Sequence, residues 1–191
     1  MKIQSANQMH SFGKIPVMTC EIKQKDINQK KRSTLWKMDP KNSQDETEIR
    51  YSKHAKSIYS DFSNDRTKIH PYHEYFLLKD NETNEVIAAA MTSHHYRTGN
   101  IKFPGYTTLV EELESNKKYL NPSEAVMAYI VSKAFNRFDD SVSTAFYTDE
   151  PSILKNIMFS QTDNGDWIMP EKRYMDFIDR AQKRYSIDFI I

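Results

Sequence analysis

The sequence predicts a single mixed α/β domain, and three observations carry this prediction. Two apolar runs, 75–78 and 86–91, flank a polar connection at 80–84, which is the pattern of a central antiparallel hairpin. The run Asn121-Pro122-Ser123-Glu124 is typical of a helix start, with Asn121 at the N-cap and Glu124 able to bond back to it. The 191 residues, 38% of them hydrophobic and 12% aromatic, suffice for one sizeable core. We therefore expect a flexible leader over 1–14 and one domain over 15–191.

Hydrophobic spacing predicts the remaining elements in chain order. Strands are expected at 15–23, 107–113, 141–148 and 187–191. Helices are expected at 26–38, 50–62, 121–138, 151–157 and 171–184. A surface loop is expected at 42–48 and a hairpin-type turn at 163–166.

Composition excludes several classes of function. The four glycines stand at least six positions apart, whereas a P-loop or a dinucleotide-binding turn needs several close together. One cysteine permits neither an internal disulfide nor a cysteine zinc cluster, and we expect no metal. A net charge of +1 gives no overall field to hold nucleic acid or a membrane, so neither is expected as a partner.

The N-terminal residues predict no secretory signal. Residues 1–12 are polar and lack an apolar segment, and no stretch approaches the roughly 20 apolar residues of a membrane span. A cytoplasmic location is expected. The polar leader is also compatible with export by a bacterial secretion system without a cleaved signal peptide, and the Lys-, Ile-, Asn- and Tyr-rich composition favours a bacterial or phage origin.

The order of elements resembles the GNAT superfamily of N-acetyltransferases over residues 15–191. The residues that carry the resemblance are the hairpin at 75–91, with its Asp80…Thr83-Asn84-Glu85-Val86-Ile87 segment, and the strand at 107–114 that leads into the helix at 121–138. The resemblance implies a mixed central sheet with helices on both faces. It also implies transfer of an acyl group, such as acetyl from acetyl-CoA, to an amine of a small molecule or of a protein.

In such a fold, acyl-CoA would lie between the strands at 107–114 and 142–148. Its pyrophosphate would lie at the N-terminus of the helix at 121–138, where unpaired amides carry partial positive charge. The resemblance thereby makes Lys117, Lys118, Asn121 and Ser123 candidate cofactor-binding residues. The chain departs from the family here, because 116–123 contains no glycine where the family has a glycine-rich loop.

The family's general base is often an acidic residue at the end of the fourth strand, and the resemblance makes Glu112 and Glu114 the candidates here. Strand alternation predicts that these two share one face and that Glu111 lies on the other. Burial can raise the pKa of such a carboxyl toward the working pH. For the general acid toward the departing thiolate, the candidates are Tyr147 and Tyr174.

Two alternatives belong to other classes. The first is a non-catalytic interaction protein with a GNAT-like fold, such as a secreted bacterial effector. The second is a hydrolase or transferase in which Cys20 is the nucleophile and His94 or His95 the base. The sequence carries no signal for a particular oligomeric state.

Overall fold

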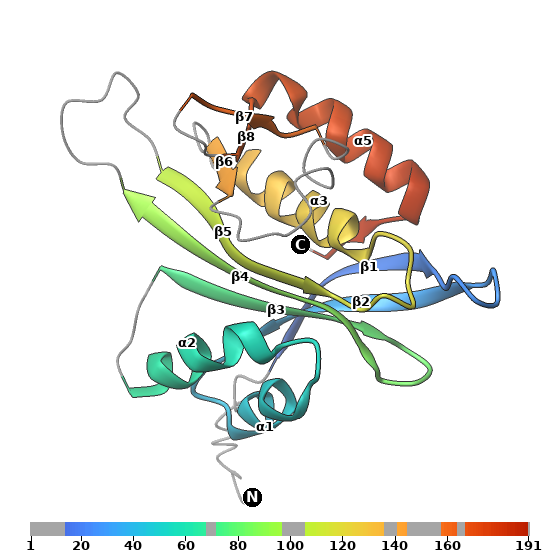
Figure 1. Cartoon of the computed structure of the whole chain (residues 1–191), viewed down its shortest axis with the longest axis vertical. Helices are drawn as coiled ribbons and strands as arrows, with labels where there is room; N and C mark the ends of the chain where they lie inside the picture. The colour runs from blue at the N-terminus through green and yellow to red at the C-terminus, as the bar shows by residue number, and fades with distance from the viewer. Residues whose placement is uncertain are drawn as a thin grey trace, which may run out of the picture.

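A nine-stranded mixed sheet lies between two layers of helices (Figure 1). The computed structural model describes residues 14–67, 72–96, 106–135, 141–144, 158–163 and 167–190. Helices α1 and α2 cover one face of the sheet, and α3 and α5 cover the other. The prediction of a mixed α/β fold is confirmed.

The strands of the sheet are β1 (Ile15–Lys23), β2 (Lys30–Met38), β3 (His73–Asp80), β4 (Val86–Tyr96), β5 (Tyr106–Ser115), β6 (Ser141–Thr144), β7 (Ser160–Gln161), β8 (Trp167–Met169) and β9 (Asp188–Phe189). The helices are α1 (Ser43–Tyr51), α2 (Lys56–Thr67), α3 (Pro122–Phe135), the 3₁₀ turn η1 (Glu171–Arg173) and α5 (Tyr174–Tyr185). The strands follow the spatial order β7-β8-β6-β5-β4-β3-β2-β1-β9. All described pairs are antiparallel except β5 with β6, which are parallel.

The β3–β4 hairpin forms the centre of the sheet, as its apolar sequence predicts. Tyr75 and Leu77 point into the core under α1 and α2, while Phe76 and Leu78 point into the core under α3 and α5. The Asp80 carboxylate closes the turn of this hairpin, because it accepts hydrogen bonds from the backbone amides of Glu82 and Thr83. Both faces of these strands are therefore buried, which explains their continuous apolarity.

Two predictions in the first third of the chain are wrong. The segment predicted as a helix at 26–38 contains strand β2 instead, because its β-branched and aromatic residues alternate on a pleated surface. Asn28, with φ of 51°, turns the chain back from β1 into β2. The segment predicted as a loop at 42–48 contains the start of α1. The Asn42 side chain caps this helix by accepting hydrogen bonds from the backbone amides of Gln44 and Asp45.

Other predicted elements agree with the structure within a few residues at their ends. The helix predicted at 50–62 is α2, which begins and ends later in the chain. The strand predicted at 141–148 is described as far as Thr144. The predicted helix at 151–157 lies outside the described residues, as does most of the turn at 163–166. No helix within the described ranges is long and apolar enough to cross a membrane.

Candidate functional site

A β-bulge in β5 shapes the candidate site. Met91 of β4 pairs with Glu112, and the next residue, Thr92, pairs with Val110, so Glu111 is an extra residue without a partner in the ladder. A bulge turns the extra residue's side chain and leaves its backbone groups outside the regular pairing. The alternation of side chains between the two faces is therefore interrupted at Glu111.

The bulge brings three carboxylates to the face covered by α2. Glu111 accepts a hydrogen bond from Ser93 Oγ of β4. Glu114 accepts one from Ser57 Oγ of α2 at 3.1 Å. Glu112 is opposite Met91, whose side chain belongs to the core under α1 and α2. The prediction that Glu111 lies on the opposite face from Glu112 and Glu114 is wrong, because strict alternation does not hold across a bulge.

Glu112 differs from its two neighbours in its electrostatic surroundings. Its carboxylate has no hydrogen bond or ion pair with any residue that the structure describes. Burial raises the pKa of Glu112 above its usual range, and the negative charges of Asp61 in α2, Glu114 and Glu111 raise it further. An unpaired carboxyl with a raised pKa is suited to take up a proton near neutral pH.

Glu112 lies two residues beyond Val110, the last residue of β5 in the described pairing with β6. The described ladder between β5 and β6 ends at the pair Val110 and Thr144. Strand β5 continues to Ser115, while residues 145–157, which follow β6, lie outside the described residues.

The loop between β5 and α3 is held between two hairpins. Two backbone hydrogen bonds of 2.8 Å join it to the β1–β2 hairpin. The Leu120 amide donates to the carbonyl of Lys23, and the Lys25 amide donates to the carbonyl of Lys118. From the β3–β4 hairpin, Asp80 accepts a hydrogen bond from Tyr119 Oη at 3.2 Å. This loop is therefore fixed in place without glycine.

Most of the loop's amides already have partners within the protein. The Lys118 amide donates to the Asn116 side chain, and the Tyr119 amide to the Asn116 carbonyl. Pro122 has no N–H, and the Glu124 amide donates to the carbonyl of Asn121. The backbone amides of a glycine-rich loop can donate to phosphate, whereas most amides of this loop already donate to acceptors within the protein.

The predicted helix start is correct in position but not in capping. Pro122 is the first residue of α3, as expected, but Asn121 has φ of 50°, outside the extended region usual for an N-cap. The Glu124 carboxylate, which is buried, turns away from the cap. It accepts hydrogen bonds from Tyr185 Oη at 2.7 Å and from Arg184 at 2.9 Å and Arg180 at 3.2 Å, all in α5.

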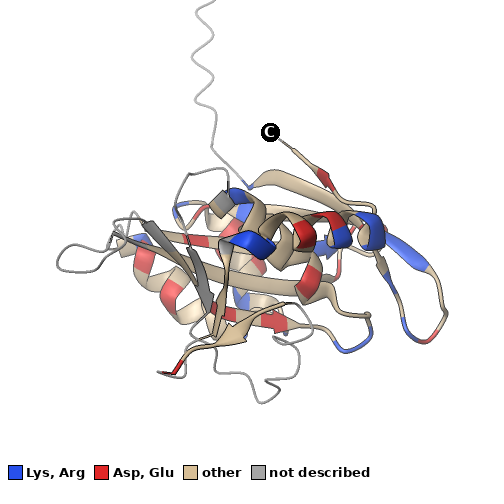
Figure 2. Ribbon diagram, turned by 90° about the horizontal axis from the view of Figure 1, so that it is seen from above, with Lys and Arg blue, Asp and Glu red and all other residues tan. Residues whose placement is uncertain are grey.

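Cations gather at this end of the molecule. Lys and Arg residues occur along the β1–β2 hairpin and in the last turns of α5 (Figure 2). Lys117 is exposed and has no ion pair among the described residues, whereas Lys118 pairs with Glu85 at 3.2 Å. Arg180 and Arg184 remain 41% and 45% exposed while they hold Glu124. The exposed guanidinium of Arg184 can also reach a ligand in solvent.

The other predicted residues are placed as follows. Asn121 is exposed and Ser123 half-buried at the start of α3, next to Lys117 and Lys118 in the chain. Tyr147 lies outside the described residues. Tyr174 is the first residue of α5, and its side chain is fully buried in the core under α3 and α5.

The alternative based on Cys20 does not fit the structure. Cys20 is 2% exposed in β1, and burial, followed by the charge of Glu21, raises the pKa of its thiol to about 12. A thiolate is the reactive form, so this cysteine is inert at neutral pH. Its proposed base His94 hydrogen-bonds Glu74 at 2.7 Å and Thr108 at 3.1 Å, and the side chain of His95 lies outside the description. Within the described part of the chain, no three His, Cys, Asp or Glu residues are grouped to hold a metal ion.

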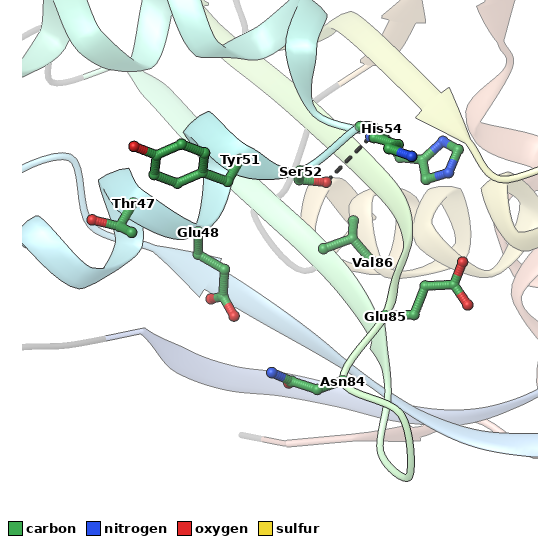
Figure 3. Close-up of a pocket in the computed structure, with 9 residues that line it drawn as sticks. Thr47, Glu48, Tyr51, Ser52, His54, Asn84, Glu85 and Val86 are labelled. Atoms are coloured by element: carbon green, nitrogen blue, oxygen red, sulfur yellow. Dashed lines mark hydrogen bonds between the residues drawn. The ribbon is translucent and has the colours of Figure 1, made fainter.

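A hollow of about 430 Å³ opens on the same face of the sheet as Glu112. The end of α1, the α1–α2 connection, the end of the β3–β4 turn and the first residue of β4 line it. In Figure 3, Glu48 points toward Asn84, Val86 lies between the two walls, and Glu85 points away. Glu48 is itself held by Lys79 and, at 2.9 Å, by Lys14. The lining residues are polar in type except Val86 and Tyr51, but apolar atoms make up the larger part of the lining surface.

Four residues near the site were not found from the sequence. Asp61 and Ser93 stand on other elements, and only the fold brings them to β5. Arg180 and Arg184 belong to a helix predicted only as amphipathic. Their i, i+4 spacing on one helix was a visible signal that they share a face.

Comparisons with known proteins identify the fold. No family model matches the chain, and no curated protein sequence matches it. A predicted acetyltransferase from Clostridium acetobutylicum, solved with acetyl-CoA, is 14% identical with a TM-score of 0.50 over 69% of this chain and 92% of that one. A mutant of the AtaT toxin bound to the C-terminus of the antitoxin AtaR is 9% identical, with a TM-score of 0.52 over 75% and 94% of the two chains. A bacterial toxin is 10% identical, with a TM-score of 0.52 over 86% and 97%. The fold is that of the GNAT acetyltransferases, as the sequence resemblance predicts.

Proposed function

We propose that this protein is an acyl-CoA-dependent N-acyltransferase in which Glu112 is the general base. One observation carries the proposal. A carboxylate with a raised pKa and no hydrogen bond or ion pair among the described residues lies at a bulge, just beyond the last described pair of the β5–β6 ladder. The GNAT fold supports the class of reaction, and the acceptor is an amine of a small molecule or of a protein.

The reaction requires one proton to be removed and one group to be transferred. Glu112 takes a proton from the acceptor ammonium, and the free amine attacks the thioester carbonyl. The C–N bond forms as the C–S bond breaks, and the acylated nitrogen then loses its second proton. This loss balances the last step, in which the CoA thiolate leaves and takes up a proton. Tyr147 and Tyr174 remain the candidates to supply that proton, although Tyr174 lies in the core.

The region around the bulge offers polar groups to the acyl donor. Thr92, directly beside the bulge, has a fully buried hydroxyl without a hydrogen-bond partner among the described residues. A buried orphan hydroxyl is costly unless a ligand or water satisfies it. The amide and carbonyl groups of a pantetheine arm have the chemistry to do so, which supports acetyl-CoA as the co-substrate.

Side chains with hydrogen-bond donors would replace a glycine-rich loop in holding the donor's phosphates. The sequence suggested four of them, the cations Lys117 and Lys118 and the uncharged residues Asn121 and Ser123. Arg180 and Arg184 join them because they reach the first turn of α3 and keep donors exposed. Arginine binds phosphate in a bidentate manner, so it can replace backbone amides as the source of hydrogen bonds.

We propose that the hollow beside the α1–α2 connection binds the part of the acceptor that does not react. It opens on the same face as Glu112. Met91 pairs with Glu112 and follows Val86 of the hollow by five positions on β4 (86 to 91). At about 3.3 Å per residue, the hollow and Glu112 are therefore about 17 Å apart along the strand. An extended acceptor can span that distance, which favours a flexible diamine or a peptide side chain over a compact amine.

The test is an acyl-transfer assay with acetyl-CoA and a panel of diamines and lysine peptides. We expect Glu112→Gln to lower kcat by about 10²- to 10⁴-fold, the usual contribution of a positioned base, with little change in acetyl-CoA affinity. Glu21→Gln, on the opposite edge of the sheet, is the matched control and should keep its activity. A Glu112→Gln variant as active as the wild type would contradict the proposal.

A further inference from the structure

Both carboxylates that line the hollow beside α1 already have cationic partners. The Glu48 carboxylate pairs with Lys79 through one oxygen and, at 2.9 Å, with Lys14 through the other. Burial opposes the ionisation of Glu48, but the hydrogen bonds from these two lysines outweigh it and lower the pKa of the carboxyl. The Glu85 carboxylate pairs with Lys118 at 3.2 Å and points away from the hollow (Figure 3). Neither carboxylate is therefore left to attract a positively charged ligand.

The cationic groups at the hollow lack such partners. Lys53 lines the hollow, is exposed and forms no ion pair within the described ranges of the chain. Arg50 is exposed as well, and its guanidinium carbon lies 5.7 Å from the ring centroid of Tyr51, another lining residue. The Arg50 guanidinium has no acidic partner in that part of the chain either. Two cations without acidic partners therefore stand at one side of the hollow.

His54 adds a hydrogen-bond donor to these two cations. It belongs to the lining, and its imidazole has no hydrogen bond or ion pair with any residue that the structure describes. An imidazole carries at least one N–H in either protonation state. Arg50, Lys53 and His54 stand within five positions of one another, at the end of α1 and in the α1–α2 connection. The donors of this group are thus supplied by one short segment.

The charge at the hollow is complementary to an anion. The second ammonium of a diamine would lie near Arg50 and Lys53 without a free carboxylate opposite, which is unfavourable because like charges repel. A carboxylate would instead receive charge-assisted hydrogen bonds from the same side chains. The hollow therefore distinguishes between the two kinds of extended acceptor and favours one that carries negative charge.

The size and walls of the hollow suit an acidic side chain. Its volume of about 430 Å³ lies within the range of about 300–1,000 Å³ that is usual for ligand sites. Val86 and Tyr51 give it apolar surface, against which the methylene groups of a glutamate can pack. The same pocket thus offers apolar contact for the stem of the side chain and donors for its carboxylate.

The position of Glu112 fixes where the anion stands in the acceptor. Val86 and Met91, the partner of Glu112, are five positions apart on β4, or about 17 Å. The amine and the carboxylate of one free amino acid are closer together than this. An extended peptide, which advances about 3.3 Å per residue, covers the distance with about five residues.

We propose that the acceptor is a peptide or protein segment in which the reactive amine lies about five residues from an acidic side chain, and that this side chain binds in the hollow beside Arg50, Lys53 and His54. The inference rests on the proposed function and narrows its acceptor from an amine in general to an amine of an acidic segment. The hollow is then a specificity site that selects the acceptor by charge and takes no part in proton transfer.

The experiment measures kcat/KM for transfer from acetyl-CoA to short peptides that have blocked N-termini and a single lysine. One further residue, placed at increasing distance on either side of that lysine, is glutamate, glutamine, lysine or phosphoserine. At a distance of about five residues, we expect glutamate to raise kcat/KM about fivefold over glutamine, the upper end of what an exposed ion pair contributes, and lysine to be the poorest. A gain with phosphoserine but not with glutamate would overturn the assignment of a carboxylate.

A charge reversal provides the matched pair of variants. Lys53→Glu should reverse the order, so that the peptide with a second lysine is used better than the peptide with glutamate. Lys56→Glu, exposed on α2 and outside the lining, is the control and should keep the wild-type order. Both side chains are exposed, so neither substitution removes a contact from the core.

Three results would contradict the inference while leaving the proposed function in place. They are equal kcat/KM for the glutamate, glutamine and lysine peptides, the same change of order in both variants, and turnover of diamines without turnover of any peptide. A wild-type protein that transfers acetyl from acetyl-CoA to no amine would instead overturn the proposed function itself.

Discussion

Tyr185 Oη donates a hydrogen bond to the Glu124 carboxylate at 2.7 Å, which joins the last turn of α5 to the first turn of α3. Both side chains are buried. Burial, followed by the hydrogen bond to Glu124, raises the pKa of Tyr185 well above its usual range. The contact fixes the C-terminal helix against the helix end where we place the donor's phosphates.

Glu124→Ala is expected to destabilise the protein by about 1–3 kcal/mol, the cost of leaving the buried Tyr185 hydroxyl unsatisfied. Arg180 and Arg184 add little to this cost because both remain open to solvent. Urea denaturation measures the change. In a Tyr185→Phe background, the same substitution should cost clearly less; an equal cost in both backgrounds would show that the hydrogen bond is not responsible.

Removing the cations near the start of α3 should weaken binding of the acyl donor. We expect Lys117→Glu and Arg184→Glu each to raise the Kd for acetyl-CoA about five- to tenfold, which corresponds to roughly 1 kcal/mol per charge-bearing contact. S-acetyl-pantetheine, which lacks the phosphates, should bind all variants equally. Lys56→Glu, exposed on α2 at the opposite face, is the control. Unchanged affinity for acetyl-CoA in both test variants would contradict the donor placement.

The pH dependence of turnover should report the charge of Asp61. Glu112 acts as a base only when it is ionised, so kcat/KM falls as pH drops below its raised pKa. Asp61→Asn removes one of the negative charges that raise this pKa, so the acidic limb of the profile should move to lower pH. Asp26→Asn, in the exposed β1–β2 turn, should leave the profile in place. A shift toward higher pH in Asp61→Asn would be the wrong sign for this assignment.

Filling the hollow beside α1 should affect the acceptor alone. Thr47 lines the hollow, and Thr47→Trp is expected to raise KM for an extended acceptor about tenfold by occupying its volume, about 1.4 kcal/mol of lost binding. The Kd for acetyl-CoA should not change. Gln44→Trp, exposed on the same helix but not part of the lining, should alter neither constant. Equal effects of the two tryptophans would indicate that the hollow is not used.

The sequence predicted the centre of the fold better than its first third. The apolar runs of β3 and β4 and the proline at the start of α3 are strong local signals, and the structure confirms them. The segment 30–38 was misread as a helix because four cations and a polar stretch surround its few apolar residues. The alternation of its side chains between the two faces of the sheet is visible only when the partner strand is known. Tertiary pairing with β1 and β3 decides its conformation.

The candidate site was predicted in its residue types but not in its geometry. Glu112 and Glu114 became candidates because the family resemblance places an acidic residue at the end of this strand, and their role stays a prediction. The bulge that turns Glu111 to the same face depends on one extra residue relative to β4, which no local pattern records. Likewise, the partner of Glu124 lies 61 positions away in Tyr185, so a local capping pattern predicted the wrong contact.

The most direct test of the account is a calorimetric titration of the protein with acetyl-CoA, followed by the same titration of Glu112→Gln. We predict saturable binding at one site in both proteins, with acetyl transfer to an amine in the wild type alone. Absence of heat at millimolar acetyl-CoA in a folded wild-type protein would contradict the account, and the GNAT fold would then serve a non-catalytic, partner-binding role.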